Sequence, residues 1–168
     1  MNERSTHDPL KEAYALLQAS SPSDLARKFI EEDQRLLKAQ QWDYTNRELV
    51  LNKVKEIVER RVEGGLVTDD KDMIELRDIL WFWYHHATGL AIWGQKNKTE
   101  ALEFSDKALK YQTSDNPNQI TRLLYLLVRD KKTEATVWLD TLSNESERTV
   151  SLGIMKEYLD GNFFPKQT

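Results

Sequence analysis

Apolar residues recur at three- and four-residue steps along most of this chain, which is the spacing of one face of an α-helix. The stretch from Leu49 to Val58 illustrates it, since Val50, Val54 and Ile57 fall on one stripe. No segment alternates apolar and polar residues as a strand does, and Val, Ile and Thr are not clustered between turn signals. The pattern predicts an all-α protein.

Prolines and glycines divide this pattern into segments. Pro9 and Pro117 each follow an Asp or Asn, as at the first turn of a helix. Gly64, Gly94 and Gly161 each follow a periodic stretch, where a glycine can end a helix. We therefore expect an array of about seven to eight helices. Their predicted ranges are 9–19, 23–40, 46–63, 70–93, 98–112, 117–130, 132–142 and 145–160.

The predicted organisation is one helical domain over residues 9–161, between a flexible amino terminus (1–8) and a tail (162–168). Short linkers predict that successive helices pack antiparallel as hairpins. Within this domain we expect amino-terminal helices over 9–65, two hairpins over 70–148, and a capping helix over 145–161 with a polar outer face.

Composition narrows the classes of partner and chemistry. The net charge is -4, and Lys and Arg are interleaved with Asp and Glu, which argues against nucleic acid as a partner. The absence of cysteine excludes disulfides and thiolate chemistry. The most apolar run, Ile79 to Trp93, is shorter than the ~20 residues that span a bilayer. Since the amino terminus also lacks a signal-like apolar stretch, we expect a cytoplasmic protein with no membrane partner.

One tetrapeptide, Lys-Thr-Glu-Ala, begins at Lys98 and returns at Lys132, after an interval of 34 residues. Each copy starts a predicted helix that follows a longer one, so the repeated unit is a helical hairpin. A period of about 34 residues is that of tetratricopeptide repeats. The segment 82–115 resembles one such repeat. Gly89, Ala101 and Ala108 stand where that family carries small residues at close helix crossings, and Phe104 supplies its aromatic residue.

The second copy, about 116–148, resembles the family less closely. It keeps Ala135, but Leu123 and Leu142 stand where small residues are expected. The resemblance covers roughly 82–160 and implies stacked antiparallel hairpins whose first helices line a concave, protein-binding surface. An unrelated helical bundle is the alternative.

The predicted binding surface is an apolar groove for a helix or an extended peptide of a partner. Its predicted residues are Trp83, His86, Leu90, Trp93, Leu124 and Leu127. The first four share a rough face at three- and four-residue steps, and the two leucines extend it from the next hairpin. Trp suits such contacts because it buries a large apolar area and still offers an N–H donor. In the alternative interpretation the amino-terminal helices fill this groove, and the same residues form core.

Catalytic and metal-binding patterns are sparse. His85 and His86 point about 100° apart on a helix, and neither has His, Asp or Glu three or four residues away, so we expect no metal site. The chain contains no GxSxG, GxGxxG, Walker or HExxH motif. Helical nucleases of the HEPN family carry an Arg and a His separated by four to six residues. Here seven residues separate Arg77 from His85, and the position after the arginine, where that family usually has a polar residue, is occupied by Asp78.

We therefore expect a non-catalytic adaptor or chaperone-like module that binds a peptide or an amphipathic helix of another protein, without a cofactor or a metal. Two alternatives remain open. One is a HEPN-like ribonuclease that uses Arg77 and His85. The other is a homo-oligomeric structural protein that buries the same surface against itself.

Overall fold

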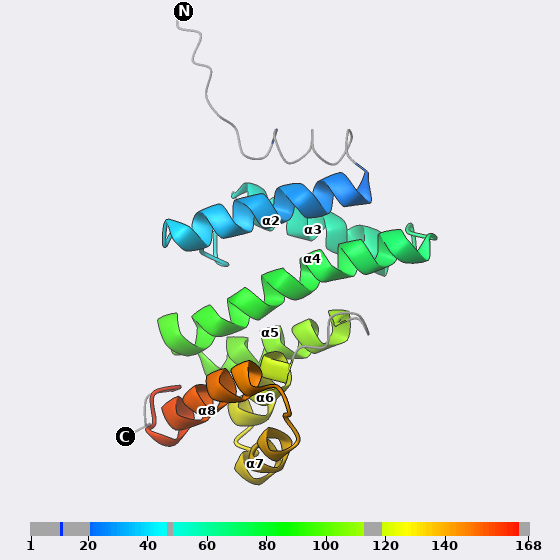
Figure 1. Ribbon diagram of the computed structural model, residues 1–168. Coiled ribbons are helices and arrows are strands. Elements are labelled where there is room, and N and C mark those ends of the chain that lie inside the picture. The colour runs from blue at the N-terminus through cyan, green and yellow to red at the C-terminus, as the bar shows by residue number, and fades with distance from the viewer. Residues whose placement is uncertain (1–10, 12–20, 47–48, 113–118, 165–168) are drawn as a thin grey trace, which may run out of the picture. The chain divides into compact units, whose positions relative to one another are not determined.

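The computed structural model describes residues 11, 21–46, 49–112 and 119–164 (Figure 1). These residues form seven α-helices and one π-helix and contain no strand, which confirms the all-α prediction. The elements are α2 (Pro22–Lys38), α3 (Val50–Glu63), α4 (Asp70–Gly89), η1 (Leu90–Gly94), α5 (Lys98–Tyr111), α6 (Gln119–Val128), α7 (Lys132–Asp140) and α8 (Glu145–Leu159). None of the helices described is long and apolar enough to cross a membrane.

The helices fall in the predicted ranges, with ends that differ by a few residues. Of the predicted helix 9–19, only Lys11 lies among the described residues, and it is helical. The predicted starts at Pro9 and Pro117 lie outside the described residues. Contacts between Cα atoms divide the chain into two compact units, 1–80 and 81–168, with the boundary inside α4. One continuous helix, α4, joins the two units without a linker. The single domain expected over 9–161 stays a prediction.

In the first unit, α2 and α3 pack against each other. The Ser21 side chain accepts a hydrogen bond from the Asp24 N–H at 3.2 Å, which caps α2 directly before Pro22. Leu25 and Phe29 of α2 are buried. The Ser23 hydroxyl also donates to Glu75 at 2.6 Å, so the first turn of α2 is tied to the first half of α4.

α3 begins at Val50, later than the predicted start at residue 46. Upstream of it, Asp43 accepts hydrogen bonds from the backbone N–H and the hydroxyl of Thr45, at 2.8 and 2.7 Å. The Asn52 side chain donates to the Asp43 carbonyl at 3.0 Å. These bonds form a turn through Thr45, and the helix starts only after it.

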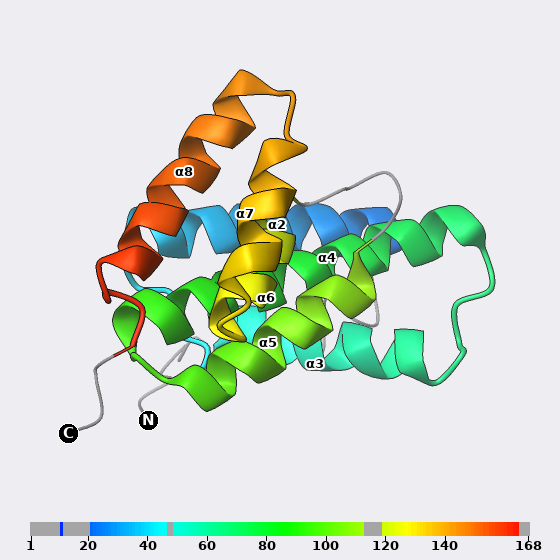
Figure 2. The same ribbon diagram turned by 90° about the horizontal axis from the view of Figure 1, so that it is seen from below.

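In the second unit, α6 contacts α5, α7 and α8 (Figure 2). Its Leu123, Leu127 and Val128 are fully buried, because neighbouring helices cover α6 on several sides. Ala101 of α5 and Ala135 of α7 are also fully buried, as the repeat prediction requires. The identity of the repeats and their arrangement as hairpins stay predictions.

The expectation that Gly89 lies at a close helix crossing is wrong. A Cβ atom added at Gly89 would meet only the ring of Trp93, at 3.7 Å, which is an ordinary van der Waals contact on the adjoining helical turn. Gly89 is partly exposed, whereas Ala87 and Ala91 on either side of it are fully buried. The small residues buried where α4 passes into η1 are therefore the two alanines.

The predicted helix 70–93 ends in the wider turn of η1. The N–H of Gln95 donates to the Leu90 carbonyl and that of Asn97 to the Ala91 carbonyl, both at 2.8 Å. A π-helix takes one residue more per hydrogen-bonded turn than an α-helix. Lys96 then adopts a left-handed backbone conformation with φ 53°, and the chain turns into α5.

The end of the second unit differs from the predicted tail. Gly161, with φ 79°, donates to Tyr158, and Asn162 donates to Glu157, which closes α8 in a Schellman motif. Phe163, two residues after Gly161, is buried, so the tail predicted from residue 162 is wrong for 162–164. Residues 165–168 lie outside the described ones. Most exposed residues of α8 are polar, and its role as a capping helix stays a prediction. Its exposed aliphatic residues are Val150, Leu152 and Leu159.

Candidate functional site: a lysine- and aromatic-lined pocket

Three residues of the predicted groove are buried, so their assignment to a binding surface is wrong. Trp83 exposes 4% of its surface, Leu124 2% and Leu127 none. Trp83 packs edge to face on Phe104 of α5, with ring centroids 5.8 Å apart. The two leucines lie on α6, which its neighbours enclose. These residues belong to the core of the second unit, and filling of the groove by the amino-terminal helices stays a prediction.

The other three residues of the predicted groove lie nearer the surface. His86 and Leu90 are partly exposed, and Trp93 exposes 40% of its surface at the end of η1. Their binding to a partner stays a prediction. Trp93 contacts Phe163, which lines a hollow in the second unit.

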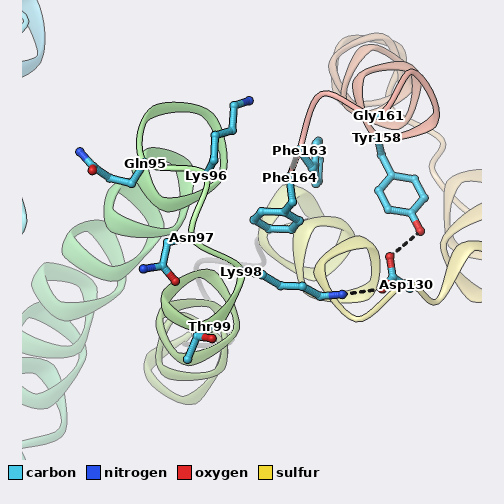
Figure 3. A pocket seen from close by; sticks show the side chains of 10 residues that line it. All are labelled: Gln95, Lys96, Asn97, Lys98, Thr99, Asp130, Tyr158, Gly161, Phe163 and Phe164. Atoms are coloured by element: carbon cyan, nitrogen blue, oxygen red, sulfur yellow. Dashed lines mark hydrogen bonds and ion pairs between the residues drawn. The ribbon is translucent and has the colours of Figure 1, made fainter. Parts of the chain in front are cut away.

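That hollow is a pocket of about 770 Å³ (Figure 3). Three separate segments line it: the connection from η1 to α5, the turn after α6, and the end of α8 with the residues that follow it. The lining residues are Gln95, Lys96, Asn97, Lys98, Thr99, Asp130, Tyr158, Gly161, Phe163 and Phe164. The volume lies within the range of ligand-binding pockets.

The first segment is positioned by the start of α5. The Asn97 side chain accepts a hydrogen bond from the Glu100 N–H at 3.0 Å and caps the helix. Lys98 and Thr99 therefore occupy its first turn, whose N–H groups have no partner within the helix. The positive end of the helix dipole thus faces this side of the pocket.

The second segment is the single residue Asp130, in the turn that follows the last residue of α6, Val128. Its N–H donates to Leu127 and the N–H of Lys131 donates to Leu126, at 3.0 and 2.9 Å, in another Schellman motif. Asp130 has φ 59°, a left-handed conformation that usually falls to glycine or asparagine. A carboxylate is therefore held at a position where the backbone alone would favour another residue.

The Asp130 carboxylate joins the three segments. The Lys98 ammonium lies 2.6 Å from its Oδ2, and the Tyr158 hydroxyl donates to its Oδ1 at 2.9 Å (Figure 3). The Lys98 hydrogen bond lowers the pKa of Asp130 below its ordinary value of 3.8, burial opposes this shift, and the Tyr158 bond adds to it. Burial raises the pKa of Tyr158 above 10.0, and the bond to Asp130 raises it further. The carboxylate is therefore held ionised and the phenol neutral.

The third segment is anchored by Phe163. Its ring meets those of Trp93 and Tyr158 edge to face, with centroids 5.5 and 5.6 Å apart. The Lys96 ammonium donates to the carbonyl oxygen of Asn162, so the same segment is also tied to the η1–α5 connection. Phe164 follows, partly exposed, on the pocket wall.

The pocket therefore combines two ammonium groups, one carboxylate and aromatic rings. Such a lining can pair with an anionic group and hold an apolar group beside it. Within the described ranges, no group of three or more His, Asp or Glu residues could hold a metal ion.

The residues of the ribonuclease interpretation lie elsewhere. The His85 ring stacks on Trp81, with centroids 4.9 Å apart and planes 10° from parallel. Its Nδ1 lies 3.1 Å from the hydroxyl of the buried Thr121. These contacts account for His85 as a packed side chain, and catalysis with Arg77 stays a prediction.

The chain matches no protein-family model, no curated protein and no solved structure. The resemblance to tetratricopeptide repeats therefore rests on the residues that carry it. It remains an interpretation of residues 82–160.

Sequence reasoning missed most of this pocket. Residues 95–97 fell between the predicted helices 70–93 and 98–112, Lys98 and Thr99 began the second of these, and Asp130 ended the predicted helix 117–130. One available signal was an aspartate at the position after α6 where glycine is common. The other was the pair of phenylalanines, 163 and 164, within a segment assigned to a tail.

Proposed function

We propose that this chain is a non-catalytic interaction module that binds a peptide segment of a partner protein at the pocket of the second unit. The observation that carries the proposal is the exposure of Trp93 beside a pocket of about 770 Å³. Trp93 contacts Phe163, and Phe163 lines the pocket, so the exposed ring lies one side chain away from the hollow. Exposed tryptophans next to a hollow are frequent anchors of protein interfaces.

The proposal keeps the partner class predicted from the sequence and changes the surface. Trp93 remains the proposed apolar anchor, with Leu90 and His86 on the two preceding turns. The buried residues Trp83, Leu124 and Leu127 instead hold the helices that present it. An adaptor of this kind needs a rigid scaffold and a small exposed site, and the aromatic packing of Trp83 on Phe104 supports such rigidity.

The test compares Trp93→Ala with the control Val137→Ala, which shortens another exposed apolar side chain away from the pocket. Each variant is used to recover partners from native extract, with quantitative mass spectrometry and a thermal melt alongside. Loss of a central interface tryptophan weakens binding about thirtyfold or more. We expect proteins that the wild type and Val137→Ala recover to be lost with Trp93→Ala while its melt is retained. Equal recovery by all three proteins would contradict the proposal.

A homo-oligomer is the second candidate, and the exposed aliphatic residues of α8 favour it. Val150, Leu152 and Leu159 are each about half exposed on one helix. Light scattering across a dilution series tests this candidate, because a homo-oligomer loses mass as the concentration falls. A constant monomer mass would exclude it over that range of concentration.

A further inference from the structure

We infer that the pocket of the second unit recognises an acidic segment, whose carboxylates pair with the ammonium groups of Lys96 and Lys98. This inference rests on the proposed function and names the class of peptide that the pocket takes. It is carried by the charges of the lining, by the pairing of each lysine, and by the aromatic rings next to them.

Lys96 supplies an ammonium group whose hydrogen-bond partner among the described residues is neutral. It donates to the carbonyl oxygen of Asn162, which is a neutral partner. Among the described residues, no carboxylate is paired with it. An ammonium group has three donors, so Lys96 can keep its bond to Asn162 and still donate to a carboxylate of a ligand.

Lys98 supplies a second ammonium group through an exchangeable ion pair. Its side chain is 45% exposed and that of its partner Asp130 is 60% exposed. Ion pairs as exposed as this one contribute little free energy, so a second carboxylate can compete for Lys98. Asp130 would then retain the hydrogen bond from Tyr158, which keeps its carboxylate in place while Lys98 turns to the ligand.

The charge balance of the lining is opposite to that of the chain. Two lysines face one aspartate in the pocket, whereas the whole chain carries a net charge of -4. The first turn of α5, with Lys98 and Thr99, adds the positive end of a helix dipole. An acidic segment is therefore attracted to this pocket, although the chain as a whole carries a net negative charge.

The aromatic residues favour a peptide over an inorganic anion. Phe164 offers apolar area on the same pocket wall as the two lysines, and the exposed ring of Trp93, which contacts Phe163, offers more beside it. A free anion cannot use that area. A segment in which acidic residues lie next to leucine or phenylalanine uses both kinds of contact.

The test uses three short fluorescein-labelled peptides that share two leucines and one phenylalanine. Their polar positions are all glutamate, all glutamine or all lysine. Binding to the full chain is followed by fluorescence anisotropy at low salt. We expect the glutamate peptide to bind about tenfold more tightly than the glutamine peptide, the lysine peptide to bind weakest, and added salt to reduce the difference.

Variants of the lining locate the recognition. We expect Lys96→Gln to weaken binding of the glutamate peptide about tenfold. Lys96→Arg should retain this binding, since the arginine keeps the charge. Lys132→Gln is the matched control, because it removes one exposed lysine of the same unit outside the pocket. It should leave binding unchanged. Circular dichroism melts identify any variant whose fold is lost.

Asp130→Asn gives the sharpest test, because it predicts a gain. The substitution removes the acid that competes for Lys98, and asparagine readily adopts the φ of 59° found here. We expect the glutamate peptide to bind several-fold more tightly to this variant. Unchanged or weaker binding would overturn the exchange of Lys98 between Asp130 and the ligand.

The outcomes separate this inference from the proposed function. Equal binding of the glutamate and glutamine peptides overturns charge recognition and leaves a peptide-binding pocket. Binding of none of the three also overturns the inference, and the recovery of partners by Trp93→Ala then decides the proposed function independently. Displacement of the glutamate peptide by inorganic phosphate at constant ionic strength would assign the lysines to phosphate groups and overturn the acidic class.

Discussion

The ring of Phe163 meets the ring of Trp93 edge to face, with centroids 5.5 Å apart and planes at 77°. This contact joins the end of η1 to the residues that follow α8. Phe163 is buried at 2% exposure, whereas Trp93 is 40% exposed. One ring therefore anchors the chain after α8, and the other presents an apolar surface next to the pocket.

The burial of Phe163 predicts a large loss of stability on truncation. Phe163→Ala should lower the free energy of unfolding by about 3–5 kcal/mol, since the variant removes a buried ring and leaves a cavity. Denaturant unfolding measures the change. Phe164→Ala is the matched control, and its partly exposed ring should cost clearly less. Equal losses in the two variants would contradict the anchoring of this segment by Phe163.

Trp83 of α4 and Trp93 of η1 should differ in how much they contribute to the stability of the fold. Trp83→Ala removes a ring that is 4% exposed and packed on Phe104. It should lower the free energy of unfolding by about 3–5 kcal/mol. Trp93→Ala should cost much less, because its ring is 40% exposed. A thermal melt of both variants compares them, and a melt of Trp83→Ala at the wild-type temperature would remove Trp83 from the core.

The pair of Lys98 and Asp130 predicts a measurable titration. The Lys98 hydrogen bond lowers the pKa of Asp130 below 3.8, so Lys98→Met should raise that pKa back toward its ordinary value. Carbon-detected NMR of the side-chain carboxyl follows the titration in both proteins. Lys132→Met serves as the control and should leave the pKa of Asp130 where it is. An unchanged pKa in Lys98→Met would show that the pair is absent in solution.

The same shifts fix the sign of the pH dependence of stability. Because the pKa of Asp130 is lower in the folded state, its contribution is complete above pH 3.8 and is lost as the pH falls through the lowered value. The pKa of Tyr158 is raised above 10.0 by burial and by the bond to Asp130. Its contribution is therefore complete below pH 10.0 and is lost as the pH rises through the raised value. Denaturant unfolding of wild type and Asp130→Asn should converge at acidic pH.

Two glycines should respond in opposite ways to alanine. Gly89 has a helical φ of -58°, and an added Cβ would meet only the Trp93 ring at 3.7 Å. Gly89→Ala should therefore stabilise the protein by about 0.5–1 kcal/mol, through the helix propensity of alanine. Gly161, with φ 79°, is the contrasting site, and Gly161→Ala should destabilise by about 1 kcal/mol. Denaturant unfolding of both variants measures the difference. Destabilisation by Gly89→Ala would support the predicted close helix crossing at Gly89.

The packing of His85 predicts that the chain does not cleave RNA. Its ring is stacked on Trp81, and its Nδ1 lies next to the Thr121 hydroxyl. An assay with labelled RNA on wild type and His85→Ala tests this expectation. Turnover by the wild type that is lost in the variant would support the ribonuclease interpretation and contradict the binding module.

The helices were predictable because their signals are local. Period, prolines and glycines placed each described helix, and Gly161 ends α8 as expected. The start of α3 was predicted too early, because Asp43 draws Thr45 into a turn that competes with helical capping. η1 was missed because a π-turn differs from an α-turn by one residue and leaves the apolar pattern almost unchanged.

The site was harder to predict because its parts are distant in the chain. Lys98 and Asp130 are 32 residues apart, and Lys96 and Asn162 are 66 residues apart. Read separately, these segments are a connection, a helix end and a tail, and none of them indicates that the three meet. The burial of Leu124 and Leu127 was equally hidden, since the sequence shows that α6 is apolar and does not show which of its sides neighbouring helices cover.

The π-helix η1 can be regarded as a one-residue insertion in the end of α4. Deleting one residue there would let the α-helix continue, and every residue beyond would turn by about 100° around the helix axis. Lys96 and Lys98 would then leave the pocket although neither had been replaced. The lining of the pocket therefore depends on the number of residues in η1 as well as on their identity, so a single-residue deletion there should displace both lysines without replacing either.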